Sequence, residues 1–249
     1  MTSLWLYTLG STLLVSLIAL IGIFTLALHE TKLQKILILL VSFAAGALIG
    51  DTFIHILPET VEKFGFSLQT SGYILTGILT FFVLEKFVHW HHCHNPNDQH
   101  HKSLVATNLV GDTLHNFTDG LFIASSYMVD IKLGLATTLA VILHEIPQEL
   151  GDFGILIHGG LNKKKAILFN FIAALFAMAG AVLGLLIGGA NEGFLQFILP
   201  FTAGAFIYIA HTDLFPEIHK ESGHAKTSLL QFVMILAGIG TMMLLLLLE

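Results

Sequence analysis

Eight long apolar stretches separated by short loops are the feature that most constrains how this chain folds. Each has about 20 residues or more, which is the length of a helix that crosses a bilayer. Only 11% of the residues are charged and 55% are hydrophobic, whereas about a quarter are charged in an ordinary soluble domain. The stretches cover residues 4–28, 36–57, 72–90, 104–128, 133–158, 166–189, 194–215 and 228–248. We therefore predict an all-α polytopic membrane protein with eight transmembrane helices in one domain, residues 1–249.

The distribution of lysines predicts which side of the membrane each loop faces. All eleven basic residues are lysines, and with the N-terminus outside only Lys63 and Lys132 lie on the outer side. Because lysines concentrate in cytoplasmic loops, both termini are expected outside the cytoplasm. We expect the protein to lie in the plasma (inner) membrane. The first apolar stretch is interpreted as a span, since it is longer than a signal-peptide core and no basic region precedes it.

The second and seventh stretches end in related sequences. Phe-Ala-Ala-Gly-Ala begins at Phe43 and is followed by Pro58-Glu59, while Phe-Thr-Ala-Gly-Ala begins at Phe201 and is followed by Pro216-Glu217. The predicted topology sends these two spans across the membrane in opposite directions. The match therefore predicts an inverted repeat, which transporters use to build two related gates. The alternative is that small-residue packing patterns recur by chance.

Polar residues occupy equivalent depths in these two spans. They are Asp51 and His55 in the second span, and His211 and Asp213 in the seventh. Near the two ends of a pathway, such residues could relay a cation in and out. Each could equally reach interfacial water from a helix end.

Two six-residue runs, 115–120 and 144–149, place carboxylates and imidazoles in the middle of adjacent apolar stretches. Their polar residues recur at helical spacings and fall on one face of each helix. The short connection makes the two helices antiparallel neighbours. A carboxylate facing lipid at a helix centre costs about 2.5–3.5 kcal/mol, so these groups must point inward. The polar residues are Asp112, His115, Asn116 and Asp119 in one helix and His144, Glu145, Gln148, Glu149 and Asp152 in the other.

This ligand set predicts a site for one or two divalent cations. Mixed imidazole and carboxylate ligands suit Zn²⁺, Fe²⁺, Mn²⁺ and Cd²⁺, whereas Mg²⁺ or Ca²⁺ favours oxygen ligands alone. Isolated polar residues in spans often only hold helices together. Two facing stripes of them are better explained by a metal site.

The motifs resemble the ZIP family of divalent metal transporters. The fourth span carries the pattern His-Asn-Phe-x-Asp-Gly, and the fifth carries His-Glu-Ile-Pro-x-Glu followed by Leu-Gly-Asp-Phe. The Gly-Asp…His-x-x-Pro-Glu pattern at 50–59 and Leu-Glu-Lys at 84–86 also fit. The resemblance extends from about residue 42 to residue 217.

The resemblance implies a 3+2+3 arrangement of helices and a binuclear metal centre between helices 4 and 5. The implied ligands are His115, Asn116, Asp119, His144, Glu145 and Gln148, with Asn170 as a weaker candidate from the sixth span. Many relatives have histidine at position 148, where glutamine is a weaker, neutral ligand. Relatives with glutamate in place of His144 tend to accept a broader range of metals, so the histidine in this chain favours zinc. Asp112, Glu149, Asp51, His55, His211 and Asp213 are further, weaker candidates.

A histidine-rich loop, residues 91–103, lies between the third and fourth spans on the predicted cytoplasmic side. His91, His92 and His94 in this loop are weak metal-ligand candidates, and similar loops occur in the family. The alternative is a solvated linker. The single cysteine, Cys93, excludes an internal disulfide framework.

We therefore predict a zinc importer that works by alternating access and is not an enzyme. The expected partners are divalent metal ions and the lipid bilayer, without nucleic acid or a resident cofactor, and the chain could form a homodimer. The alternative is an intramembrane zinc-dependent hydrolase that uses a metal-bound water. His144-Glu145 resembles the start of the His-Glu-x-x-His motif, but Gln148 occupies the place of its second histidine. A metal sensor is a third alternative.

Overall fold

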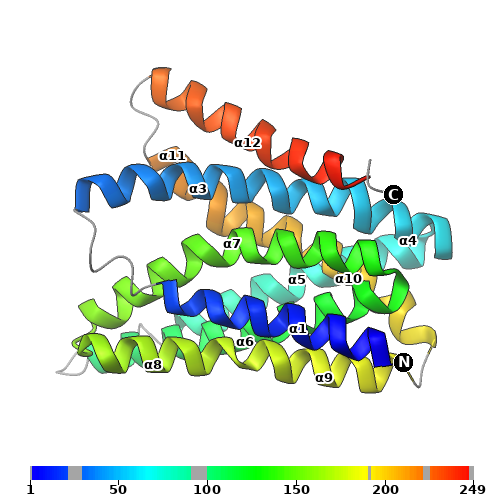
Figure 1. Cartoon of the computed structure of the whole chain (residues 1–249), viewed down its shortest axis with the longest axis horizontal. Coiled ribbons are helices and arrows are strands. Elements are labelled where there is room, and N and C mark those ends of the chain that lie inside the picture. Colours follow the sequence, from blue (N-terminus) through cyan, green and yellow to red (C-terminus); the bar gives the residue numbers. More distant parts are fainter. Residues whose placement is uncertain (1, 22–29, 91–99, 190–191, 221–224, 247–249) are drawn as a thin grey trace.

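The computed structural model describes residues 2–21, 30–90, 100–189, 192–220 and 225–246 (Figure 1). These residues are almost entirely helical, and no strand occurs among them. The first half contains α1 (Thr2–Ile18), η1 (Ala19–Ile21), α3 (Glu30–Gly50), η2 (Asp51–Ile56), α4 (Leu57–Phe64), α5 (Leu68–Trp90) and α6 (His100–Val129). The second half contains α7 (Ile131–His158), α8 (Lys163–Ala174), α9 (Phe176–Gly188), α10 (Glu192–Ile209), η3 (Ala210–Leu214), α11 (Phe215–Lys220) and α12 (Ala225–Leu246).

Six helical stretches in the described residues are long and apolar enough to cross a membrane. They are Ser3–Ile21, Ile38–Phe64, Leu68–Lys86, Lys163–Gly188, Gly193–His219 and Ala225–Leu245. The prediction of an all-helical polytopic membrane protein is therefore confirmed. Helices α6 and α7, which contain the predicted spans 104–128 and 133–158, are not among the six, so the count of eight spans stays a prediction.

The second and seventh spans both run further than the sequence predicts and contain a π-helical segment at the same place. The spans predicted to end at residues 57 and 215 continue through α4 and α11. In η2 the N–H of Leu57 bonds the carbonyl of Thr52, and in η3 the N–H of Phe215 bonds that of Ala210. These wider turns come immediately before Pro58 and Pro216, so the helix continues past a residue that lacks an N–H.

Glycines let α3 and α10 each approach a neighbouring helix until the two backbones are in contact. A Cβ added to Gly46 of α3 would collide with the backbone carbonyl of Ile235 in α12. A Cβ added to Gly204 of α10 would collide in the same way with the carbonyl of Ile74 in α5. The related segments thus make related contacts, and α3 and α10 run in opposite directions (Figure 1).

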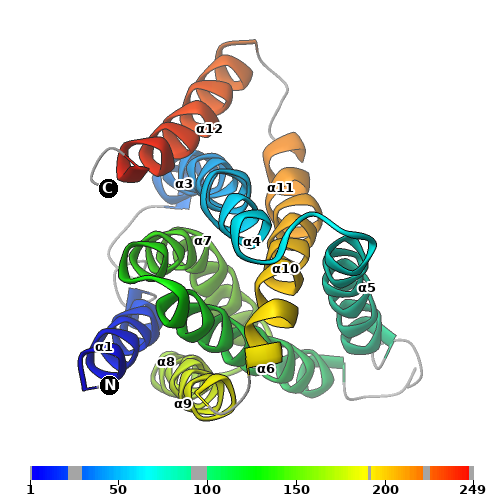
Figure 2. The ribbon, with the colours of Figure 1, turned by 90° about the vertical axis from the view of Figure 1, so that its right-hand side faces the viewer.

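The helices form two groups, which Figure 2 shows from one end of the bundle. One group consists of α1, α6, α7, α8 and α9, and the other of α3, α4, α5, α10, α11 and α12. Of the six candidate spans, Ile38–Phe64 and Gly193–His219 have the largest share of buried residues, at 61% and 56%, while the spans in α5 and α12 have 17% and lie at the edge. The two groups meet where α3 contacts α7 and α10 contacts α6.

Short capped connections fix α6, α7 and α8 relative to one another. The carboxylate of Asp130 accepts a hydrogen bond from the N–H of Lys132 at 2.7 Å and starts α7 directly after α6. The side chain of Asn162 accepts one from the N–H of Lys165 at 3.0 Å and starts α8. The turn before α8 contains Gly160, whose φ of 90° is in the left-handed region.

We predict that Gly46→Ala destabilises the protein, because its methyl group would force α3 and α12 apart. Overpacking of this kind costs about 1–3 kcal/mol. The unfolding temperature of the purified protein in detergent should fall by several degrees. The control is Gly10→Ala on α1, whose added methyl would have no neighbour within 4 Å. Equal unfolding temperatures for the two variants would contradict the close α3–α12 contact.

Candidate metal centre

Four side chains from two antiparallel helices converge in the interior of the bundle. His115 and Asp119 are one turn apart on α6, and His144 and Glu145 are consecutive on α7. One ligand atom of each lies within 4.8 Å of the others. Asp119, His144 and Glu145 are almost fully buried, and the His115 side chain is 12% exposed.

The separations between these ligand atoms are close to those around a tetrahedral zinc ion. His115 Nε2 lies 3.3 Å from His144 Nε2, and His144 Nε2 lies 3.2 Å from Asp119 Oδ2. Glu145 Oε1 lies 3.5 Å from His115 Nε2 and 3.7 Å from His144 Nε2. Ligands at 2.0–2.1 Å from a tetrahedral ion are about 3.3 Å apart. The geometry can therefore accommodate a four-coordinate divalent ion with little rearrangement.

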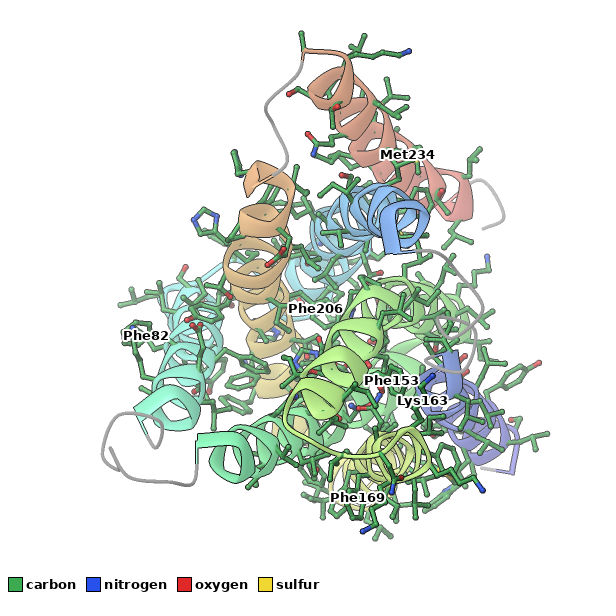
Figure 3. The ribbon with its side chains drawn as sticks, turned by 90° about the vertical axis from the view of Figure 1, so that its left-hand side faces the viewer. Phe82, Phe153, Lys163, Phe169, Phe206 and Met234 are labelled. Carbon is green, nitrogen blue, oxygen red and sulfur yellow. The ribbon has the colours of Figure 1, made fainter. Side chains whose placement is uncertain are left out.

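The orientation of His144 also suits a ligand. Its Nδ1 lies 3.1 Å from the carbonyl of Ala140, as expected for a hydrogen bond donated by Nδ1–H. That bond leaves the lone pair of Nε2 directed at the other three ligands. The ring of Phe206 packs against the imidazole, with 6.1 Å between ring centroids. Figure 3 shows Phe206 in the interior of the bundle, whereas Phe82 and Phe169 point outward.

Three of the remaining carboxylates on these helices are held by amides instead of joining the four-residue cluster. Each has an asparagine as its partner: Asp112 accepts from Asn116 Nδ2 at 2.8 Å, Asp152 from Asn108 Nδ2 at 2.7 Å, and Glu149 from Asn170. Asn116 and Asn170 thus have their amide nitrogens turned to a carboxylate, and their amide oxygens have no hydrogen-bond partner. Sequence inspection missed Asn108, although it lies four residues before Asp112 on α6.

The other candidates lie elsewhere. Gln148 is half-buried, three residues beyond Glu145 on α7. Asp51 and His55 form a separate buried pair in η2, with His55 Nδ1 3.4 Å from Asp51 Oδ1. His211 in η3 is exposed. The side chain of Asp213 and the residues His91, His92 and His94 fall outside the described part of the chain.

Buried polar atoms without a hydrogen-bond partner gather in and around the cluster. Both carboxylate oxygens of Glu145 and one oxygen of Asp119 lack a partner. A buried polar group left in this state costs about 1–3 kcal/mol. Unpartnered polar atoms of this kind are expected where a bound ligand completes the coordination of the side chains.

The fold and the cluster together define an integral membrane protein with a buried set of metal-type ligands. Comparison with known protein families supports this description. The profile of the family described as ZIP Zinc transporter matches residues 2–107 and 89–246. The chain belongs to this family. Because the family consists of transporters, the chain is a divalent metal transporter and not an enzyme, and the hydrolase alternative has no support.

Similar proteins come from several animals. The zinc transporter SLC39A7 of Mus musculus is 30% identical over 335 residues, which cover 97% of this chain and 70% of that protein. Zinc transporter zipt-7.1 of Caenorhabditis briggsae is 30% identical over 306 residues, covering 96% of this chain and 78% of that protein. Zinc transporter ZIP13 of Pongo abelii is 36% identical over 221 residues, covering 82% of this chain and 65% of that protein.

We predict that His144→Ala weakens zinc binding to the purified protein by more than tenfold, because it removes one of four converging ligand atoms. Loss of even an outer-shell partner typically costs about 10–100-fold in affinity. Equilibrium dialysis with ⁶⁵Zn²⁺ in detergent measures the change. The control is Thr113→Val on α6, since the Thr113 hydroxyl bonds the carbonyl of Leu109 in its own helix. Unchanged zinc affinity in His144→Ala would contradict this site.

Proposed function

We propose that the chain imports zinc into the cytoplasm by alternating access, with His115, Asp119, His144 and Glu145 as its mid-membrane binding site. The observation that carries the proposal is the 3.2–3.7 Å spacing of the two histidine nitrogens from each other and from the two carboxylates, which is close to the ligand spacing around a tetrahedral zinc ion. The mouse, nematode and orangutan relatives are named zinc transporters, which favours the same ion. Fe²⁺, Mn²⁺ and Cd²⁺ accept the same ligand types and are the competing ions.

The proposal includes α6 and α7 as spans, giving eight transmembrane helices in a 3+2+3 arrangement. At 1.5 Å per residue these helices are about 45 and 42 Å long, which exceeds the roughly 30 Å hydrocarbon core. Their charged side chains do not argue against a span, because Asp112, Asp119, Glu145 and Glu149 are buried inside the bundle.

We further propose that the first and last three spans form an inverted repeat. The matched π-helical segments η2 and η3 support this, as do the matched glycine contacts of α3 with α12 and of α10 with α5. The lysine distribution sets the orientation in the proposal, with both ends of the chain outside the cytoplasm. Location in the plasma membrane and assembly as a homodimer stay predictions.

Alternating access would move the two helix groups against each other. The four proposed ligands all belong to the group that contains α6 and α7, while Asp51, His55 and His211 belong to the other group. Sliding of α7 along α3 and of α6 along α10 would therefore move the bound ion relative to Asp51, His55 and His211. The transport rate would also depend on pH, since metal binding requires deprotonated ligands.

The outer route in this proposal passes the Asp51–His55 pair. Both oxygens of Asp51 and both ring nitrogens of His55 lack a hydrogen-bond partner, although the two side chains are buried. His55 also lines a cavity of about 490 Å³ that reaches the surface. The charged residues around this cavity are the acids Glu59, Glu62 and Asp130 and the bases Lys63 and Lys132, with Lys63 Nζ 3.4 Å from Glu59 Oε1.

Two other groups of residues stay predictions about the inner, cytoplasmic end of the ion route. His211 and Asp213 would serve the exit as Asp51 and His55 serve the entrance. The histidine-rich segment 91–103, predicted as a loop although α6 begins at His100, would collect ions after they cross. A second ion beside the first, with Asn116 and Gln148 among its ligands, would make the centre binuclear.

Zinc flux into liposomes tests the proposed function directly. Purified protein should raise the signal of a trapped zinc-sensitive dye well above that of empty liposomes when zinc is added outside. His144→Ala should lower the initial rate to the level of empty liposomes, while Thr113→Val should keep it. If the unaltered protein gives no zinc-dependent influx under any zinc or proton gradient, the proposal is wrong.

His55→Ala should separate entry from binding. Because His55 lies apart from the four-residue cluster, equilibrium zinc binding to the purified protein should stay within about twofold. The initial rate of zinc influx should fall by about tenfold or more, because the variant removes the imidazole that would hold the ion on its outer route. A lowered affinity with an unchanged influx rate would contradict a role in the outer route.

A further inference from the structure

Each histidine of the four-residue cluster packs against a phenylalanine from the other helix group. The ring centroid of Phe206 on α10 lies 6.1 Å from that of His144, and the centroid of Phe81 on α5 lies 6.4 Å from that of His115. The rings of the two pairs are inclined at 66° and 84°, so both contacts are edge-to-face. Two of the four proposed ligands therefore touch helices that carry none of the four.

The two phenylalanines are themselves held in place by a third. Phe122 on α6 packs against Phe206, with 5.5 Å between ring centroids, and against Phe81, with 6.3 Å. Phe122 and Phe206 are fully buried, and Phe81 is 7% exposed. Because a protein interior is close-packed, none of these rings can turn without displacing a neighbour. The imidazoles therefore face a fixed aromatic surface.

The orientation of an imidazole decides whether its nitrogen points at the ion. A ligand has to be held within about 10–20° of the productive geometry by its surroundings. His144 is held by two contacts, the hydrogen bond between its Nδ1 and the carbonyl of Ala140 and the packing against Phe206. Turning of the imidazole would move its Nε2 away from Asp119 Oδ2, which now lies at 3.2 Å. The phenylalanine therefore helps to keep the nitrogen in place.

The phenylalanines and the ligands lie on opposite sides of the boundary between the two helix groups. Phe81 and Phe206 belong to the group of α3, α5, α10 and α12, whereas the ligands belong to the group of α6 and α7. Sliding of one group along the other would take both rings away from the imidazoles. The four ligands would stay together on α6 and α7 but lose this support.

We propose that Phe81 and Phe206 are positioning residues for metal transport, which hold the imidazoles of His115 and His144 in the orientation that binds the ion. They do so only in the arrangement of the helix groups seen here. The affinity of the cluster is therefore high in this arrangement and lower after the groups have moved, which favours release of the ion. This coupling to movement rests on the proposed function; the effect of the two rings on metal binding does not.

Co²⁺ binding to the purified protein in detergent tests the positioning role without any transport. Four-coordinate Co²⁺ absorbs visible light much more strongly than the hydrated ion, and its absorption follows the geometry of the ligands. Phe206→Leu and Phe81→Leu should each weaken Co²⁺ binding by about threefold to tenfold, because an edge-to-face ring contact is lost. The absorbance per bound ion should also fall, since the imidazole is no longer fixed.

A matched control removes a phenylalanine of the same helix that packs elsewhere. The ring of Phe201 on α10 lies 6.3 Å from that of Phe122 and 5.2 Å from that of Phe197. Phe201→Leu should lower the unfolding temperature through lost packing but leave the affinity and the absorption of Co²⁺ unchanged. Phe81→Tyr keeps the aromatic ring and should bind Co²⁺ as the unaltered protein does.

Zinc influx into liposomes provides a second readout. In Phe206→Leu the half-saturating zinc concentration should rise severalfold while the maximal rate stays within about twofold, as expected when only binding is weakened. A lower maximal rate with an unchanged half-saturating concentration would overturn the positioning role.

Two Co²⁺ results would also overturn the proposal. One is that Phe206→Leu and Phe81→Leu keep the affinity and absorption of the unaltered protein; the other is that Phe201→Leu changes them as much. If Phe206→Leu does not fold, Phe81→Leu and Phe81→Tyr decide the matter. Failure of the proposed function gives a different pattern, in which His144→Ala leaves Co²⁺ absorption unchanged or the unaltered protein moves no zinc into liposomes.

Discussion

Carboxylates at the depth of a membrane core cannot face lipid, and the arrangement of this protein depends on that constraint. Asp112, Asp119, Glu145 and Glu149 would each cost about 2.5–3.5 kcal/mol on a lipid-facing surface. Helices α6 and α7 therefore pair with their polar faces inward, and α1, α3, α8, α9 and α10 pack around them. Helices α6 and α7, at the centre of the bundle, are not among the six described stretches that are apolar enough to cross a membrane by length and composition.

Backbone contacts at two glycines hold together the helix group that contains α3, α5, α10 and α12. Gly46 and Gly204 bring α3 against α12 and α10 against α5, and side-chain clashes would separate these pairs if either glycine had a Cβ. Close contact of this kind replaces the hydrophobic driving force that is missing between helices in lipid. The result is one helix group that carries the proposed ligands and another that carries Asp51 and His55, a division that suits movement of one group against the other.

Amides decide how the many carboxylates between these helices are used. Asp119 and Glu145 join two histidines, whereas Asp112 and Glu149 are each turned toward an asparagine. The polar interior therefore separates into a mixed nitrogen and oxygen group and an oxygen group.

The sequence by itself determined the membrane class, the pairing of α6 with α7 and the inward direction of their polar faces, because hydropathy and helical spacing are local properties. It also predicted His115, Asp119, His144 and Glu145 as ligands, together with Asn116 and Gln148 and a set of weaker candidates. Tertiary structure alone decided that these four converge, that Asn116 and Asn170 turn to Asp112 and Glu149, and that α4 and α11 continue past Pro58 and Pro216. Those outcomes depend on helix rotation and on contacts between distant segments, which spacing along one helix does not contain.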